Sequence, residues 1–149
     1  MTTNLLIYTF RTFPLIEDLE EISKDIVVLG KLKTDISKVE NMLLLGKYSM
    51  ILGIAKTNGT SVFETQGVNK FNKSKILTDE KDRYVLNFPE DGYKNIKIND
   101  SFTTSFCNWG MYKISNFIEK ENLKILHSFV HIKKNDVEIL KDYLRENYH

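Results

Sequence analysis

Cys107 is the only cysteine in the chain, and its neighbours are those expected around a nucleophile. A hydroxyl-rich run, Thr103 to Ser105, comes before it, and a segment with helix-like apolar spacing begins directly after it. A thiol at the start of a helix is stabilised as a thiolate by the helix dipole, and the free backbone N–H groups there can bind an oxyanion. The position therefore predicts nucleophilic attack on an acyl carbon. The alternative is that Cys107 is a small buried hydrophobic residue without chemistry.

Two further residues supply the other parts of a thiol-hydrolase triad. His131 ends the next apolar run and is predicted to act as general base towards the thiol and then as general acid towards the leaving amine. Glu64 lies upstream and is predicted to orient the imidazole and stabilise its charged form. The alternatives are a strand-end histidine with ordinary partners and a solvated carboxylate. His127 lies within the same strand without such a role, and His149 is expected to be solvated.

Length and composition predict one soluble domain spanning residues 1–149. The 149 residues are 42% hydrophobic and 28% charged, which is typical of a globular protein with one core. The net charge of +1 gives no case for nucleic-acid or membrane binding. A single cysteine cannot form an internal disulfide, and Met1 to Asn4 lacks the basic region of a signal peptide. We therefore expect a cytoplasmic protein.

Strand-like and helix-like segments alternate along the chain, which predicts an α/β fold. We expect a single-domain three-layer sandwich with a mostly parallel central sheet, of the phosphorylase/hydrolase-like kind. Cys107 and His131 both fall at the carboxyl ends of predicted strands, where ligands of such sheets bind. An Asp-Gly step at 91–92 predicts a hairpin between two short extended pieces. The predicted strands are 4–10, 26–29, 48–55, 61–71, 84–88, 95–98, 102–106 and 124–132, and the predicted helices are 16–24, 37–45, 108–122 and 135–146.

Three short patches in the chain follow one another in a recognisable order. They are a Glu with an Asn five positions later, a Thr-x-x-Cys-Asn box, and a hydrophobic residue followed by His. Together with the first strand, they resemble the pyroglutamyl peptidase I (pyrrolidone-carboxylate peptidase) family of cysteine peptidases, which remove an N-terminal pyroglutamate from peptides. The chain resembles a divergent and short member of that family. The residues of the three patches are Glu64 and Asn69, then Thr104, Cys107 and Asn108, then Val130 and His131.

This resemblance implies the chemistry of a thiol protease of the omega peptidase kind. It implies Cys107 as nucleophile, His131 as base and Glu64 as the residue that orients His131. The implied substrate is a peptide or small amide with a pyroglutamyl or similar N-terminal residue, and no metal or organic cofactor is required. Members of the family commonly associate, so the resemblance also implies a homodimer or homotetramer.

The resemblance extends less fully to the substrate pocket. Phe10 and Phe13 keep the spacing of the two aromatic residues that line the family's pyroglutamyl pocket, and Phe106 is a third candidate for substrate binding. The alternative is that Phe10 and Phe13 are core residues. Lys75 stands nearest to the family's arginine on the oxyanion side, although a lysine is a point charge and not a planar fork.

Substitutions in the family's glycine-rich loops leave the substrate open. Thr9 and Arg11 replace glycines of the first loop, and Ile54 replaces a glutamine whose hydrogen bonds it cannot make. One alternative function is another amidase or N-terminal peptidase on the same scaffold, with Arg11 recognising a charge on the substrate. The other is a non-catalytic binding protein that retains the fold.

Overall fold

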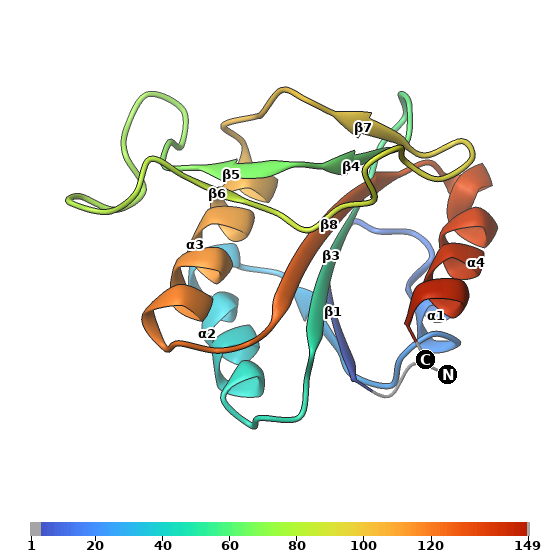
Figure 1. The fold of residues 1–149 in the computed structure, drawn as a ribbon, viewed down its shortest axis with the longest axis horizontal. Helices are drawn as coiled ribbons and strands as arrows, with labels where there is room; N and C mark the ends of the chain where they lie inside the picture. Colours follow the sequence, from blue (N-terminus) through green and yellow to red (C-terminus); the bar gives the residue numbers. More distant parts are fainter. Residues whose placement is uncertain (1–3, 149) are drawn as a thin grey trace.

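A six-stranded sheet forms the centre of the fold, and a separate two-stranded sheet lies beside it (Figure 1). The computed structural model describes residues 4–148. The strands are β1 (Leu5–Phe10), β2 (Ile26–Leu29), β3 (Met50–Lys56), β4 (Val62–Glu64), β5 (Gln66–Val68), β6 (Arg83–Val85), β7 (Lys97–Asn99) and β8 (Leu126–Ile132). The helices are α1 (Ile16–Glu20), α2 (Leu32–Leu43), α3 (Phe106–Lys120) and α4 (Val137–Asn147), with a 3-10 turn at Lys134–Asp136.

The larger sheet has the strand order β2-β1-β3-β8-β4-β7. All neighbouring strands in it are parallel except β4 and β8, which run antiparallel. Helices α2 and α3 cover one face, and α1 and α4 cover the other (Figure 1). The predicted α/β class and mostly parallel central sheet of a three-layer sandwich are therefore confirmed.

The apolar strands are continuous in sequence because both faces of the sheet are buried. In β1, Leu5 and Ile7 pack in the core cluster on the α1/α4 side, whereas Leu6 and Tyr8 pack in the cluster on the α2/α3 side. All four side chains are fully buried. Strands β3 and β8 divide their side chains between the two clusters in the same alternating way, as the period of two in a strand requires.

The segment 61–71, predicted as one strand, is divided at Thr65 into β4 and β5, which belong to different sheets. Contacts with two distant segments hold the chain at the break, because the Thr65 hydroxyl donates to the carbonyl of Asn99 at 2.8 Å and the Thr65 carbonyl accepts from Leu86 N–H at 2.9 Å. Gly67 in β5 packs against α3 so closely that a Cβ atom would lie 2.9 Å from the backbone nitrogen of Tyr112. Only a glycine permits this approach.

The predicted hairpin across 91–92 is wrong, because β6 and β7 do not pair with each other. Strand β6 pairs antiparallel with β5, and β7 pairs parallel with β4 in the central sheet. Gly92, at φ 73°, instead closes a local turn in which its N–H donates to the carbonyl of Pro89 at 3.0 Å. The two strands find long-range partners, which a local turn signal cannot indicate.

The predicted strand at 102–106 is also absent, and this changes the setting of the thiol. Residues 102–104 are irregular, and α3 begins at Phe106. Cys107 is therefore the second residue of a helix and does not follow a strand of the sheet. Helix α2 begins earlier than predicted, at Leu32, because Asp35 accepts from the N–H groups of Gly30 and Lys31 and so extends the first turn.

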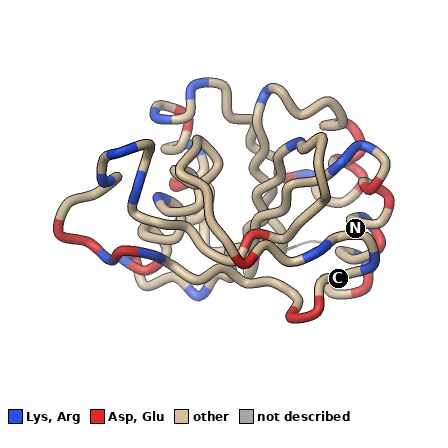
Figure 2. Tube along the Cα trace, turned by 90° about the horizontal axis from the view of Figure 1, so that it is seen from above, with Lys and Arg blue, Asp and Glu red and all other residues tan. Residues whose placement is uncertain are grey.

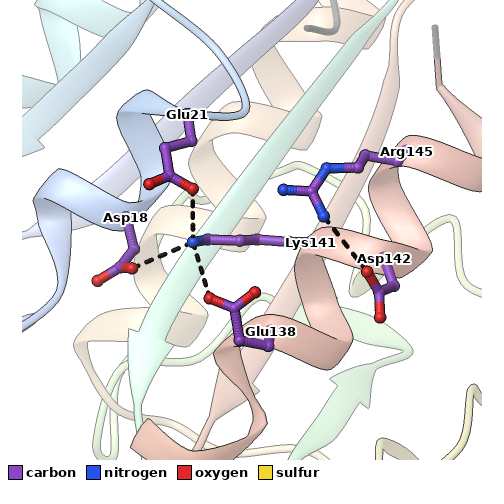
Figure 3. Close-up of polar contacts among 6 residues, drawn as sticks. All are labelled: Asp18, Glu21, Glu138, Lys141, Asp142 and Arg145. Carbon is purple, nitrogen blue, oxygen red and sulfur yellow. Dashed lines mark hydrogen bonds and ion pairs between the residues drawn. The ribbon is translucent and has the colours of Figure 1, made fainter.

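A buried lysine ties the two helices of the α1/α4 face together (Figure 3). The Nζ atom of Lys141, 2% exposed, contacts Glu21 at 2.8 Å, Glu138 at 3.0 Å and Asp18 at 3.1 Å. Its hydrogen bond with Glu21, followed by those with Glu138 and Asp18, outweighs burial and raises its pKa. Three carboxylates thus compensate one buried charge and hold α4 against α1.

Positions of basic and acidic residues alternate along much of the described chain (Figure 2). Within residues 4–148, no helix is long and apolar enough to cross a membrane.

A substitution at Gly53 in β3 tests how tightly the core is packed between the sheet and helices α2 and α3. A Cβ atom at this position would overlap the rings of Phe129 and Tyr8. We expect Gly53→Ala to lower the free energy of unfolding by about 1–3 kcal/mol, the usual cost of overpacking a core. Urea denaturation followed by Trp109 fluorescence measures this change. Gly59→Ala is the matched control, since its nearest neighbour lies at 3.7 Å, and an equal loss in both variants would contradict the packing argument.

Candidate active site

Cys107 lies in the first turn of α3, on the sheet face covered by α2 and α3. The residue before the helix, Ser105, makes no side-chain capping bond. In the described part of the chain, no group accepts a hydrogen bond from the backbone N–H groups of Phe106, Cys107 and Asn108. The thiol is partly exposed. A nucleophile in this position has three free donors and the positive end of a helix dipole around it.

Asn108 fixes the start of α3 in place. Its side chain is fully buried, accepts from Val68 N–H at 2.8 Å, and donates to the carbonyls of Val68 and Lys70 at 2.9 Å each. The neighbouring Asn69 uses its own amide to hold the long loop after β5, accepting from Ile76 and Leu77 N–H. The two asparagines of the sequence patches therefore both hold backbone in place, Asn108 at the start of α3 and Asn69 in the loop after β5.

His131 and Glu64 meet across the antiparallel pair of β8 and β4. The Nδ1 atom of His131 lies 2.6 Å from Oε2 of Glu64. The Glu64 side chain is buried, and that of His131 is 18% exposed. This contact leaves the Nε2 atom of His131 as the nitrogen for other partners.

Cys107 lies near enough to His131 for the two groups to interact. Burial lowers the pKa of His131, but the interactions with Cys107 and Glu64 outweigh it and raise the pKa to about 9. These interactions favour the charged form of the imidazole at neutral pH. A thiol and an imidazole that interact in this way can deliver a thiolate to an electrophile and a proton to a leaving group.

Asn99 is a part of the site that the sequence did not indicate. Its Nδ2 atom donates to Oε1 of Glu64 at 2.8 Å, so both carboxylate oxygens of Glu64 are held. Asn99 stands directly opposite Glu64 in the parallel pairing of β4 and β7. No motif carries this signal, because it depends on the register of two strands far apart in sequence.

His127 forms a second buried hydrogen-bonded chain on the same face. Its Nε2 atom lies 2.7 Å from the Tyr8 hydroxyl, and its Nδ1 atom lies 2.9 Å from the Ser115 hydroxyl. Burial lowers the pKa of His127 to about 3, so it stays neutral where His131 is charged. Because the unfolded chain takes up a proton near the ordinary pKa of 6.5, His127 makes the free energy of unfolding fall as pH falls from there towards 3. His149 lies outside the described residues.

A hollow with a volume of about 410 Å³ adjoins the thiol. Phe10 and Phe106, both predicted to bind substrate, lie in its wall together with Cys107. Phe106 is 61% exposed, and its ring lies against that of Phe71 with centroids 5.3 Å apart. Phe13 is not in this wall. It is buried in the core cluster on the α1/α4 side, which matches the core alternative for that residue.

The other residues expected near the pocket lie in three different places: on the surface, in the wall of the hollow and in the core. Lys75 is exposed on the loop after β5 and forms no hydrogen bond or ion pair with the three residues Cys107, His131 and Glu64. Arg11 lines the hollow, whereas Thr9 is fully buried and donates to the carbonyl of Ile54 at 2.8 Å. Ile54 itself is buried in the α1/α4 cluster. Within residues 4–148, no group of three or more metal-ligating side chains is present.

Comparison with known proteins identifies the fold. A pyrrolidone carboxyl peptidase from Thermococcus litoralis superposes with a TM-score of 0.73 over 97% of this chain and 96% of that chain, at 16% identity. The pyroglutamyl peptidase I from Bacillus amyloliquefaciens gives a TM-score of 0.76 over 93% of each chain, at 13% identity. The chain has the pyroglutamyl peptidase fold.

A third solved structure has the same fold, whereas comparison of sequences alone finds no match. A mutant pyrrolidone carboxyl peptidase from P. furiosus superposes with a TM-score of 0.70 over 95% of this chain and 94% of that chain, at 13% identity. No protein-family model matches the chain, and no curated protein matches its sequence. The resemblance seen in short sequence patches is therefore confirmed in three dimensions, at an identity that fits a divergent relative.

The two buried histidines should titrate far apart. We expect the imidazole of His131 to titrate near pH 9, because Cys107 and Glu64 favour its charged form, and His127 to remain neutral at pH 5. NMR of the imidazole nitrogens measures both. The stability contributed by His131 is present below about pH 6.5 and is lost as pH rises through about 9. Glu64→Gln should lower the His131 midpoint, and a parent midpoint at or below 6.5 would contradict the geometry.

Asn99 should act through Glu64. We expect Asn99→Ala to slow alkylation of Cys107 by iodoacetamide at pH 7 by up to about tenfold, or about 1.4 kcal/mol, which is the scale of a hydrogen bond to a charged group. The His131 midpoint should fall in the same variant. Asn95→Ala is the matched control, because that side chain is exposed and has no hydrogen bond in the described structure. Equal alkylation rates in parent and Asn99→Ala would rule out this role.

Proposed function

We propose that the chain is a cysteine peptidase that removes an N-terminal pyroglutamyl or similar residue from peptides. The observation that carries this proposal is the position of His131 in β8, hydrogen-bonded to Glu64 and close enough to interact with Cys107 in the first turn of α3. The pyroglutamyl peptidase fold around these residues supports the same reading. Peptides and small amides are the proposed substrates.

In the first half of the reaction, the thiolate of Cys107 attacks the carbonyl carbon of the N-terminal residue. A C–S bond forms, and the negative charge moves to the carbonyl oxygen, where the free N–H groups at the start of α3 can bind it. The C–N bond then breaks as His131 gives its proton to the leaving amine. The acyl group remains on Cys107 as a thioester.

In the second half, water replaces the amine. The now neutral His131 takes a proton from water as it attacks the thioester carbon, and the C–S bond breaks. The acyl group leaves as a carboxylic acid, and the thiolate–imidazolium pair is restored. Glu64, held by Asn99, keeps the imidazole oriented and stabilises its charge in both halves.

The proposal extends to the setting of the reaction. None of these steps requires a metal or organic cofactor. We place the activity in the cytoplasm, and self-association into a dimer or tetramer stays a prediction from the resemblance.

Hydrolysis of a fluorogenic pyroglutamyl amide under reducing conditions tests the proposal. The parent should release the fluorophore, and Cys107→Ala should lower kcat by more than about 10³-fold, because it removes the nucleophile. His131→Ala should lose at least about 10²-fold, the usual scale of general acid–base catalysis. Lys124→Ala, an exposed position away from the site residues, is the control and should keep parental activity.

Two results would favour the alternatives. If the parent cleaves other aminoacyl amides in a panel but not the pyroglutamyl amide, the chain is a different amidase on this scaffold. If it cleaves none, and Cys107→Ser keeps the cellular role, the chain is a non-catalytic binding protein, and the proposed function is wrong.

A further inference from the structure

We infer that the hollow beside Cys107 accepts an acyl group that carries a carboxylate, which Arg11 and Lys56 bind. This inference rests on the proposed function, because it takes Cys107 to be the nucleophile. It names a substrate class different from the neutral lactam: monoamides of small dicarboxylic acids, and peptides capped by such an acid.

The charge of the hollow supports an anionic occupant. Ten residues line it, of which Arg11 and Lys56 are basic and none is acidic. Neither Arg11 nor Lys56 has a hydrogen bond or ion pair from its side chain in the described part of the molecule. Two free cations in the wall that also holds Cys107 favour a substrate that brings the opposite charge.

The nearest carboxylate on the α2 side is already engaged. Asp35, at the start of that helix, accepts from the N–H groups of Gly30 and Lys31 at 2.8 and 2.9 Å, and these bonds lower its pKa. Its other oxygen lies 3.4 Å from Nζ of Lys38. No ion pair joins it to Arg11, so Arg11 keeps its charge available for a ligand.

The helix that begins at Phe106 adds to the same field. Phe106, the first residue of α3, lines the hollow, and the first N–H groups of this helix have no acceptor in the described part of the chain. The amino end of a helix carries partial positive charge, so the dipole of α3 favours an anion here, whereas the amino end of α2 is already occupied by the carboxylate of Asp35. The two cations and the dipole of α3 therefore act in one direction on an occupant of this space.

The hollow lacks several of the side chains that were expected to bind a flat neutral lactam. Of the two rings expected to hold it, Phe10 lines the hollow, but Phe13 is 4% exposed in the core on the opposite face. Ile54 and Thr9 are fully buried and are not in the wall, so neither can hydrogen-bond a substrate. Among the lining residues, only Thr12 has a side-chain hydroxyl that could hydrogen-bond a neutral ligand.

The reaction keeps the same bond changes as the proposed function. In a glutaryl amide, the free carboxylate binds Arg11 and Lys56 while the amide carbonyl is presented to Cys107. The amide C–N bond breaks, the acyl group passes through a thioester, and water gives a dicarboxylic acid and the amine. No oxidant, reductant or further reactant is needed.

A pair of fluorogenic substrates that differ by one charge tests this inference. They are the glutaryl amide of aminomethylcoumarin and its methyl ester, compared with the pyroglutamyl amide. The parent should have a kcat/KM at least about tenfold higher for the carboxylate than for the ester, which is the scale of one charge-assisted hydrogen bond. Arg11→Gln and Lys56→Gln should each reduce this ratio, and the double variant should remove it. Lys124→Gln, which removes an exposed charge elsewhere, should leave the ratio unchanged.

A binding measurement separates this inference from the proposed function. Glutarate, but not neutral glutaramide, should slow iodoacetamide alkylation of Cys107 in the parent, and less so in Arg11→Gln. If glutarate protects Cys107 in this way but the parent cleaves no amide, the anion site stands and the proposed function fails. If the parent cleaves the pyroglutamyl amide and the ester as fast as the glutaryl amide, and glutarate gives no protection, the anion site is wrong and the proposed function stands.

Discussion

The contact between His131 and Glu64 is the constraint on which the site depends. A buried carboxylate costs free energy unless its oxygens are satisfied, and here one oxygen meets Nδ1 of His131 while Asn99 donates to the other. This arrangement requires β4 to lie between β8 and β7 in a defined register. The short strand β4, antiparallel to β8, therefore assembles the site, because it places the carboxylate of Glu64 against His131 near the end of β8.

The two faces of the sheet serve different purposes. On the α1/α4 side, an apolar cluster and the Lys141 network hold the helices in place. On the α2/α3 side, the cluster also contains polar chains, with His127 bridging Tyr8 and Ser115, and the thiol at the start of α3. Burial keeps His127 neutral, whereas neighbouring charges keep His131 positive. The same residue type therefore has two protonation states on one face, set by surroundings alone.

The site and the hollow beside it follow the resemblance to different degrees. Glu64 holds His131 and is itself held by Asn99, and His131 interacts with Cys107. Phe13, one of the two rings predicted for the pocket, is instead buried in the core, and the basic side chains of Arg11 and Lys56 line the hollow. Chemistry depends on a few fixed contacts, whereas specificity depends on the wall residues, which can change without disturbing the reaction.

The sequence by itself determined the elements that rest on local patterns. Continuous apolar runs predicted β1, β2, β3 and β8, and apolar spacing predicted the helices, because both signals lie within one segment. Residue types and motif spacing also selected Cys107, His131 and Glu64 as candidate site residues, since side-chain chemistry and short spacings can be read directly from a sequence. Only the tertiary structure decided which face each residue meets. The split of 61–71 between two sheets, the position of Asn99 opposite Glu64, and the burial of Phe13 all depend on pairing and packing between distant segments, which no local pattern contains.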